Sequence, residues 1–179
     1  MFKLKRRLIM VMAGMIGAVV PAAPAVGQIA YGPYLFKNGV SQMCMDVAYG
    51  STANGARIQQ WPCYGGPPEQ WTMVYETTVG VVHYFQLVNG NSPPGNPKCL
   101  DVPWGNPAPG AKLQLWDCLG AARQLWAVQT ISTAGNGAVR VKNLQTGLCL
   151  DNTDWSGNAG TSLQQWTCND LPPQHWYGP

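Results

Sequence analysis

The chain has 179 residues, and only 11% of them are charged, with 11 Lys and Arg against 8 Asp and Glu. That length is enough for one domain with a real hydrophobic core and not obviously enough for two. Four of the basic residues lie within the first seven positions, so residues 28–179 have seven basic against eight acidic side chains, a net charge of −1. Such a surface lacks the positive footprint of nucleic-acid-binding proteins, and we expect no nucleic-acid partner.

Residues 1–27 predict a secretory signal peptide. Lys3, Lys5, Arg6 and Arg7 precede an uncharged run from Leu8 to Val20, and small residues suited to cleavage follow at 23–27. A run of this length is too short for the hydrocarbon core, which needs about 20 helical residues. The alternative is an uncleaved membrane anchor. We expect a secreted protein without a membrane span in its mature form, folded as one domain over residues 28–179.

The remaining sequence is rich in Gly, Pro, Trp and Gln. Short apolar runs between Gly, Pro and Asn, with no sustained helical periodicity, predict an all-β domain. Six cysteines in an exported chain indicate disulfides rather than metal or redox chemistry. His83 and His175 are isolated, so we expect no metal and no cofactor.

A unit of about 50 residues occurs three times, and its landmarks keep the same spacing. Each first cysteine is followed by Asp at 2 positions, Gly at 11, Gln at 15, Trp at 17, Cys at 19 and a second Trp at 27. The first cysteines are Cys44, Cys99 and Cys149, and we place the units at about 30–80, 81–133 and 134–179. Three four-stranded units indicate a closed pseudo-threefold body, because propellers normally need at least four blades.

The motif Cys-x-Asp, Gln-x-Trp-x-Cys and Gln-x-Trp resembles the ricin B-type (R-type) lectins and carbohydrate-binding modules. In the second unit it reads Cys99-Leu100-Asp101, Gln114-Leu115-Trp116-Asp117-Cys118 and Gln124-Leu125-Trp126. The resemblance implies a β-trefoil of twelve strands with one disulfide inside each unit. Repeat symmetry then selects the pairs Cys44–Cys63, Cys99–Cys118 and Cys149–Cys168. The resemblance also assigns the terminal tryptophans of the units to the core: Trp71, Trp126 and Trp176.

The same resemblance implies sugar binding, with galactose-like sugars or polysaccharides as ligands. If the paired cysteines face each other across two antiparallel strands, Asp46 lies opposite Trp61, and Gln59 shares the face of Trp61. The carboxylate and the amide then serve sugar hydroxyls, and the indole serves the apolar face of the ring. The predicted carbohydrate-binding residues are Asp46, Gln59 and Trp61; Asp101, Gln114 and Trp116; and Asp151, Gln164 and Trp166. The opposite strand face is expected to be core, although Gln60 and Gln165 fit it less well.

Each of these residues also has a structural interpretation. The aspartates can satisfy turn amides, and Trp61, Trp116 and Trp166 can be core residues. The repeat spacing leaves open whether the aromatic residues that follow each aspartate flank the sites: Tyr49, Trp104 and Trp155.

One departure from the family pattern affects the expected number of working sites. Family sites often have Asn three residues before the final Trp, and this chain has Pro68, Arg123 and Pro173 there. Glu69 also replaces the usual Gln of the first terminal Gln-x-Trp. Two roles are open for Arg123: it replaces the missing Asn as a donor, or it favours an acidic sugar.

We therefore expect a monomeric carbohydrate-binding protein with up to three weak sites. An enzyme is not expected, because a glycosidase needs two carboxylates about 5–9.5 Å apart and the three repeated aspartates belong to separate units. The alternative is a secreted β-trefoil for protein binding or inhibition, with degenerate sugar sites.

Overall fold

A computed structural model describes residues 27–178 as strands joined by turns and short 3-10 helices. The predicted signal peptide lies outside this range, apart from Gly27 at its end. No helix within residues 27–178 combines the length and the apolar character that crossing a membrane requires. The strands are β1 (Ala30–Leu35), β2 (Lys37–Asn38), β3 (Cys44–Val47), β4 (Ala56–Trp61), β5 (Gln70–Val79), β6 (Val82–Asn89), β7 (Lys98–Asp101), β8 (Gln114–Asp117), β9 (Leu125–Thr130), β10 (Val139–Asn143), β11 (Cys149–Asn152), β12 (Leu163–Trp166) and β13 (Trp176–Tyr177). The 3-10 helices are η1 (Ala48–Gly50), η2 (Pro67–Glu69), η3 (Pro103–Gly105), η4 (Ala122–Gln124), η5 (Ser132–Ala134), η6 (Thr153–Trp155) and η7 (Pro172–Gln174).

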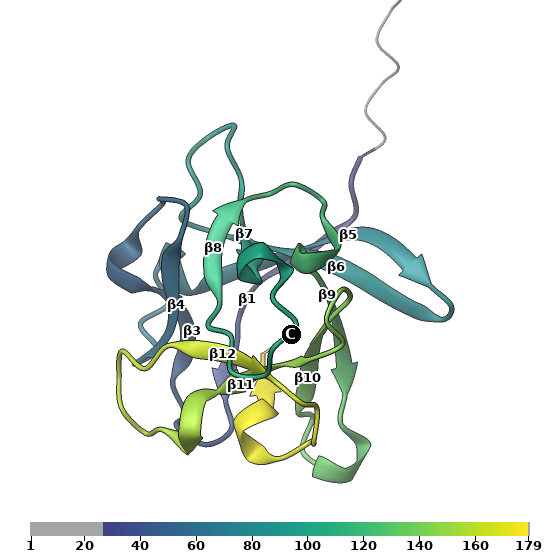
Figure 1. Cartoon of the computed structure of the whole chain (residues 1–179). Helices are drawn as coiled ribbons and strands as arrows, with labels where there is room; N and C mark the ends of the chain where they lie inside the picture. The colour runs from purple at the N-terminus through teal and green to yellow at the C-terminus, as the bar shows by residue number, and fades with distance from the viewer. Residues whose placement is uncertain (1–26, 179) are drawn as a thin grey trace, which may run out of the picture.

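Antiparallel pairing closes part of the sheet into a barrel (Figure 1). The ring runs from β1 through β5, β6, β9, β10 and β13 to β2. β1 and β2 are two parts of one strand divided at Phe36, where the partner changes from β5 to β3 and β13. This division is why the structure has thirteen strands where the resemblance implied twelve.

Each unit adds one hairpin to the barrel: β3–β4, β7–β8 and β11–β12. β4 pairs with β8, and the bridges Gln59–Ser162 and Lys112–Gln164 join the third hairpin to the other two. A six-position barrel with three hairpins around a pseudo-threefold axis is a β-trefoil. The all-β, β-trefoil prediction is therefore confirmed.

The terminal tryptophan of every unit is completely buried. Trp71, Trp126 and Trp176 each donate their indole N–H to a backbone carbonyl, at 3.0, 3.0 and 3.1 Å. The acceptors are equivalent: Met45, Leu100 and Leu150, each one residue after the first cysteine. A second buried layer comes from the hairpins, at Ile58, Leu113 and Leu163.

The disulfides join Cys44 to Cys63, Cys99 to Cys118 and Cys149 to Cys168, each with a Cα–Cα distance of 5.1 Å. The register expected from them is wrong by two residues. Cys44 faces Trp61, and Asp46 faces Gln59 rather than Trp61. The reason is that β4 ends at Trp61, so Cys63 lies beyond the ladder, with Pro62 between, and its disulfide runs diagonally. The other two hairpins have the same register.

Gln60 and Gln165 are both completely buried, although they are polar residues on the core face. Their side-chain amides cross to the neighbouring unit. Gln60 Nε2 donates to the carbonyls of Ser156 and Asn158, and Gln165 Nε2 donates to those of Asn106 and Ala108. These amides hold loops of adjacent units in place, which explains two residues that fitted the core poorly in the sequence.

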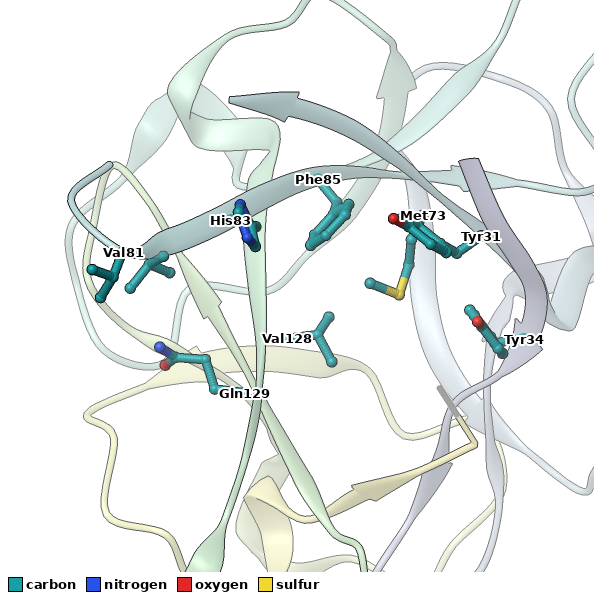
Figure 2. A pocket seen from close by; sticks show the side chains of 9 residues that line it. Tyr31, Tyr34, Met73, Val81, His83, Phe85, Val128 and Gln129 are labelled. Carbon is teal, nitrogen blue, oxygen red and sulfur yellow. The ribbon is translucent and has the colours of Figure 1, made fainter. Parts of the chain in front are cut away.

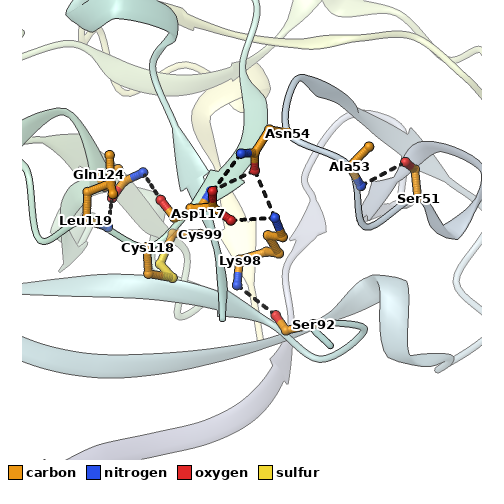
Figure 3. Close-up of polar contacts among 10 residues, drawn as sticks. All are labelled: Ser51, Ala53, Asn54, Ser92, Lys98, Cys99, Asp117, Cys118, Leu119 and Gln124. Atoms are coloured by element: carbon orange, nitrogen blue, oxygen red, sulfur yellow. Dashed lines mark hydrogen bonds and ion pairs between the residues drawn. A yellow bond between two sulfur atoms is a disulfide. The ribbon is translucent and has the colours of Figure 1, made fainter. Parts of the chain in front are cut away.

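A polar network also links the first two units (Figure 3). The nearly buried Lys98 contacts Asp117 and donates to Asn54 Oδ1 at 2.9 Å, while Asn54 Nδ2 donates to Asp117 Oδ2 at 2.7 Å. The hydrogen bonds from Lys98 and Asn54 lower the pKa of Asp117. This network ties the loop before β4 to the end of β8.

Candidate functional sites

The repeated aspartate and glutamine form a direct hydrogen bond in all three units. Gln59 Nε2 donates to Asp46 Oδ1 at 2.9 Å, and the equivalent distances are 2.8 Å to Asp101 and 2.9 Å to Asp151. The corrected register causes this contact, since it places each aspartate directly opposite its glutamine. The amide fixes the carboxylate and keeps its own carbonyl oxygen for other donors.

A tryptophan and a 3-10 turn stand beside each pair. Trp61 and Trp166 are 43% and 42% exposed, so their indoles are available at the surface instead of belonging to the core. The turn that follows the aspartate carries Tyr49 and Trp104 at positive φ, 59° and 56°. Such φ is uncommon for a non-glycine residue, and the side chains of these two residues are 96% and 92% exposed.

The first site is an open cleft of about 440 Å³ around Asp46, Gln59 and Trp61. Tyr64 donates its hydroxyl to Asp46 Oδ2 at 3.2 Å, and Arg57 donates through Nη2 to Gln59 Oε1 at 2.9 Å. Burial and the charge of Asp46 raise the pKa of Tyr64 to about 12, so this phenol remains a donor at neutral pH. The site therefore combines fixed polar groups with exposed aromatic faces.

The second site is closed. Arg123 Nε forms an ion pair with Asp101 Oδ2 at 2.9 Å, and Asp101 is completely buried. The ring centroids of Trp104 and Trp116 are 6.4 Å apart, while Trp104 remains 92% exposed. The remaining hollow is only about 20 Å³, so the arginine occupies the place where a ligand would reach the aspartate.

The third site is a cleft of about 180 Å³ around Asp151, Gln164 and Trp166. Gln174 Nε2 donates to Asp151 Oδ2 at 3.1 Å, so both oxygens of this carboxylate accept an amide N–H. Pro173 lines the cleft where family sites often have Asn, and it offers no side-chain donor. Asp154 and Trp155 come from the turn η6 and line the same cleft.

The buried carboxylates of the first and third sites, Asp46 and Asp151, have pKa values shifted in the same direction. Burial raises the pKa of Asp46 and of Asp151, and the hydrogen bonds from their glutamines oppose that rise. A carboxylate held by amides in a half-apolar cleft is a fixed acceptor for hydroxyl groups.

The first and third sites lie at the boundary with a neighbouring unit. Gly160 of the third unit lines the first site, and a Cβ there would lie 3.7 Å from Trp61. Lys112 of the second unit reaches the third site, where Nζ donates to Gln164 Oε1 at 2.7 Å. The sequence reasoning missed Arg57, Tyr64, Lys112 and Asp154, because none of them recurs at the same offset in all three units.

A separate hollow of about 510 Å³ lies at the side of the barrel, between β1, β5, β6 and β9 (Figure 2). Its walls are mostly apolar, including Tyr34, Met73, Phe85 and Val128, and no carboxylate lines it. It therefore lacks the acid–amide pair that the three sites share.

Comparison with known proteins agrees with this architecture. A family model described as ricin-type beta-trefoil lectin domain-like matches residues 25–116, 78–166 and 122–178. Beta-galactoside-specific lectin 2 of Viscum album is 28% identical over 141 residues, which cover 77% of this chain and 21% of that lectin. The chain thus spans about a fifth of the length of that relative.

Two solved structures have the same fold. The designed threefold symmetric protein ThreeFoil superposes with a TM-score of 0.71 at 25% identity, covering 81% of this chain and 96% of that one. An exo-β-1,3-galactanase of Clostridium thermocellum gives 0.70 at 28% identity, covering 87% of this chain and 30% of the enzyme. From its repeated motif, its fold and the family match over residues 25–178, the chain belongs to the ricin-type β-trefoil lectin domain-like family.

Proposed function

We propose that this chain is a secreted carbohydrate-binding module that binds neutral, galactose-like saccharides at its first and third sites. The observation that carries the proposal is the pairing of a fixed carboxylate and amide with a half-exposed indole in an open cleft. Sugar hydroxyls bind the polar pair, and the C–H face of the ring packs on Trp61 or Trp166. The name of the Viscum album relative, a β-galactoside-specific lectin, favours the same class of ligand.

We assign no catalytic step to these sites. Asp151 and Asp154 share the third cleft, but both oxygens of Asp151 accept amide N–H groups. Glycoside hydrolysis requires a carboxyl group that can direct a proton at the glycosidic oxygen, and two amide N–H groups already occupy the oxygens of Asp151. A non-catalytic module fits the relatives, because the chain matches only 30% of the galactanase.

Binding at each shallow site is expected to be weak, with a Kd around 1 mM, or about −4 kcal/mol. A monomer with two open sites gains useful affinity when one polymer engages both. We expect the apparent affinity for an immobilised galactan to exceed the affinity for free lactose by at least tenfold.

Replacing both Trp61 and Trp166 with alanine should abolish retention on the galactan column, because each open site loses its apolar platform. Each single variant should be retained less than the native protein. Trp116→Ala is the matched control, since its site is closed, and its retention should not change. Circular dichroism checks that all variants are folded. Full retention of the double variant would place galactan binding outside the two open clefts. Capture of a protein ligand with no binding to any neutral glycan would favour the protein-interaction alternative.

Arg123→Asn should open the second site. The shorter amide frees Asp101 Oδ2 and restores the residue that the family often has at this position. Calorimetric titration with a galactoside should then report three sites in place of two. The variant should also melt at a lower temperature, because a buried carboxylate loses its cationic partner. An unchanged stoichiometry in a folded variant would mean that Trp104 and Trp116 close the site without the arginine.

A further inference from the structure

We propose that the first site, which binds neutral galactosides, binds saccharides that also carry a carboxylate or a sulfate ester more tightly, and that Arg57 recognises this anionic group. The inference rests on the proposed sugar binding and names a ligand class for one of its sites. Arg57 lies on β4, is exposed, and lines the same cleft as Asp46 and Trp61. Its guanidinium uses Nη2 to hold Gln59 Oε1, which leaves further N–H groups for a ligand.

The charges around the three sites differ, although the backbone frame is the same. At the second site Arg123 is paired with the carboxylate of Asp101. At the third site Lys112 faces two carboxylates, Asp151 and Asp154, and its Nζ already donates to Thr153 and Gln164. Arg57 belongs to none of the ion pairs found in the described part of the chain, and a single carboxylate, Asp46, lines its cleft.

The first cleft also has room for a substituent. Its volume of about 440 Å³ exceeds the 180 Å³ of the third cleft. With the ring hydroxyls on Asp46 and Gln59 and the ring face on Trp61, an anionic group on the sugar edge can meet the guanidinium. The planar fork of arginine suits carboxylate and sulfate oxygens, because it offers two parallel N–H donors.

The test isolates each open site by removing the tryptophan of the other. Trp166→Ala leaves the first site, and Trp61→Ala leaves the third site as the matched control. Each protein is titrated with digalactose, digalacturonate and a sulfated digalactose. With only the first site left, either anionic ligand should bind about two- to five-fold more tightly than digalactose, the range for an exposed ion pair. This preference should shrink in 0.5 M salt, where the Debye length falls to a few ångströms.

Arg57→Gln in the Trp166→Ala background should bring the ratio of anionic to neutral affinity to about one. The readout is this ratio and not the absolute affinity, because Arg57 also holds Gln59 and its loss weakens all three ligands alike. With only the third site left, no preference for an anionic ligand is expected. Binding of digalactose in both backgrounds without a preference at the first site would overturn this inference and leave the proposed function standing. A preference that survives Arg57→Gln would also overturn it. No binding of any of the three ligands would refute the proposed function itself.

Discussion

Replacing Trp126 with alanine should lower the free energy of unfolding by about 3–5 kcal/mol, the usual cost of removing a buried aromatic side chain. The indole is completely buried and donates to the carbonyl of Leu100 at 3.0 Å. Its removal leaves a cavity in the core and an unpaired carbonyl. Urea unfolding followed by far-ultraviolet circular dichroism measures the change, with the disulfides intact in every variant.

Two further variants separate the causes of that loss. Trp126→Phe keeps much of the apolar area but removes the donor, so it should cost about 1–3 kcal/mol from the unsatisfied carbonyl. Trp61→Ala should cost less than about 1 kcal/mol, because this indole is 43% exposed. Equal losses for Trp61→Ala and Trp126→Ala would place Trp61 in the core and remove the basis for the first site.

The repeat explains why the fold could be predicted from the sequence. Residues that the three units share stand at one spacing, and these are the residues that build the common frame: the disulfides, the Asp–Gln pairs and the buried terminal tryptophans. Comparing the three copies with one another shows which residues the common frame needs. The resemblance then assigns the second tryptophan of each unit to the core and the first to the sugar site. The strand register was missed because a disulfide beyond a strand end does not mark a rung of the ladder.

What makes the sites unequal could not be predicted in the same way. Arg123 was visible as a departure from the family pattern, but only the structure shows its guanidinium on Asp101. Tyr49, Trp104 and Asp154 occupy the middle of equivalent turns at positive φ. Trp155 therefore stands one residue later in its turn than Tyr49 and Trp104 do in theirs. Lys112 acts in the unit after its own. Such differences depend on side-chain direction and on contacts between units, which spacing does not encode.

Glu69→Gln should stabilise the protein by about 1–3 kcal/mol at pH 7, the cost of an unsatisfied buried acceptor. Glu69 is completely buried; its Oε2 accepts the N–H groups of Tyr64 and Gly65, while Oε1 has no partner within the described residues. The equivalent Gln124 accepts from Leu119 and donates through Nε2 to the carbonyl of Asp117, seven residues earlier. The residue of the first unit that corresponds to Asp117 is Pro62. An ionised Glu69 has no N–H or O–H group to donate to the Pro62 carbonyl, whereas a protonated Glu69 has one.

The effect should depend on pH in a defined direction. Burial, opposed by the two backbone hydrogen bonds and assisted by the charge of Asp46, raises the pKa of Glu69 above its ordinary value. Folding therefore favours the protonated acid. Its contribution to stability is complete below the unfolded pKa of about 4.3 and is lost as the pH rises through the higher folded pKa. The advantage of Glu69→Gln should accordingly be absent at pH 3 and grow toward neutrality in urea titrations across this range.

The reverse change in the second unit is the matched control. Gln124→Glu places a carboxylate against the carbonyl of Asp117, so it should destabilise the protein at pH 7 and recover on acidification. If Glu69→Gln stabilises the protein and Gln124→Glu destabilises it, the backbone carbonyl next to this side chain needs a hydrogen-bond donor in both units. Glu69 also holds the backbone of Tyr64, whose hydroxyl donates to Asp46, so its protonation state bears on the first site as well as on the core. A stability difference between Glu69→Gln and the native protein that stays constant from pH 3 to 8 would contradict the raised pKa.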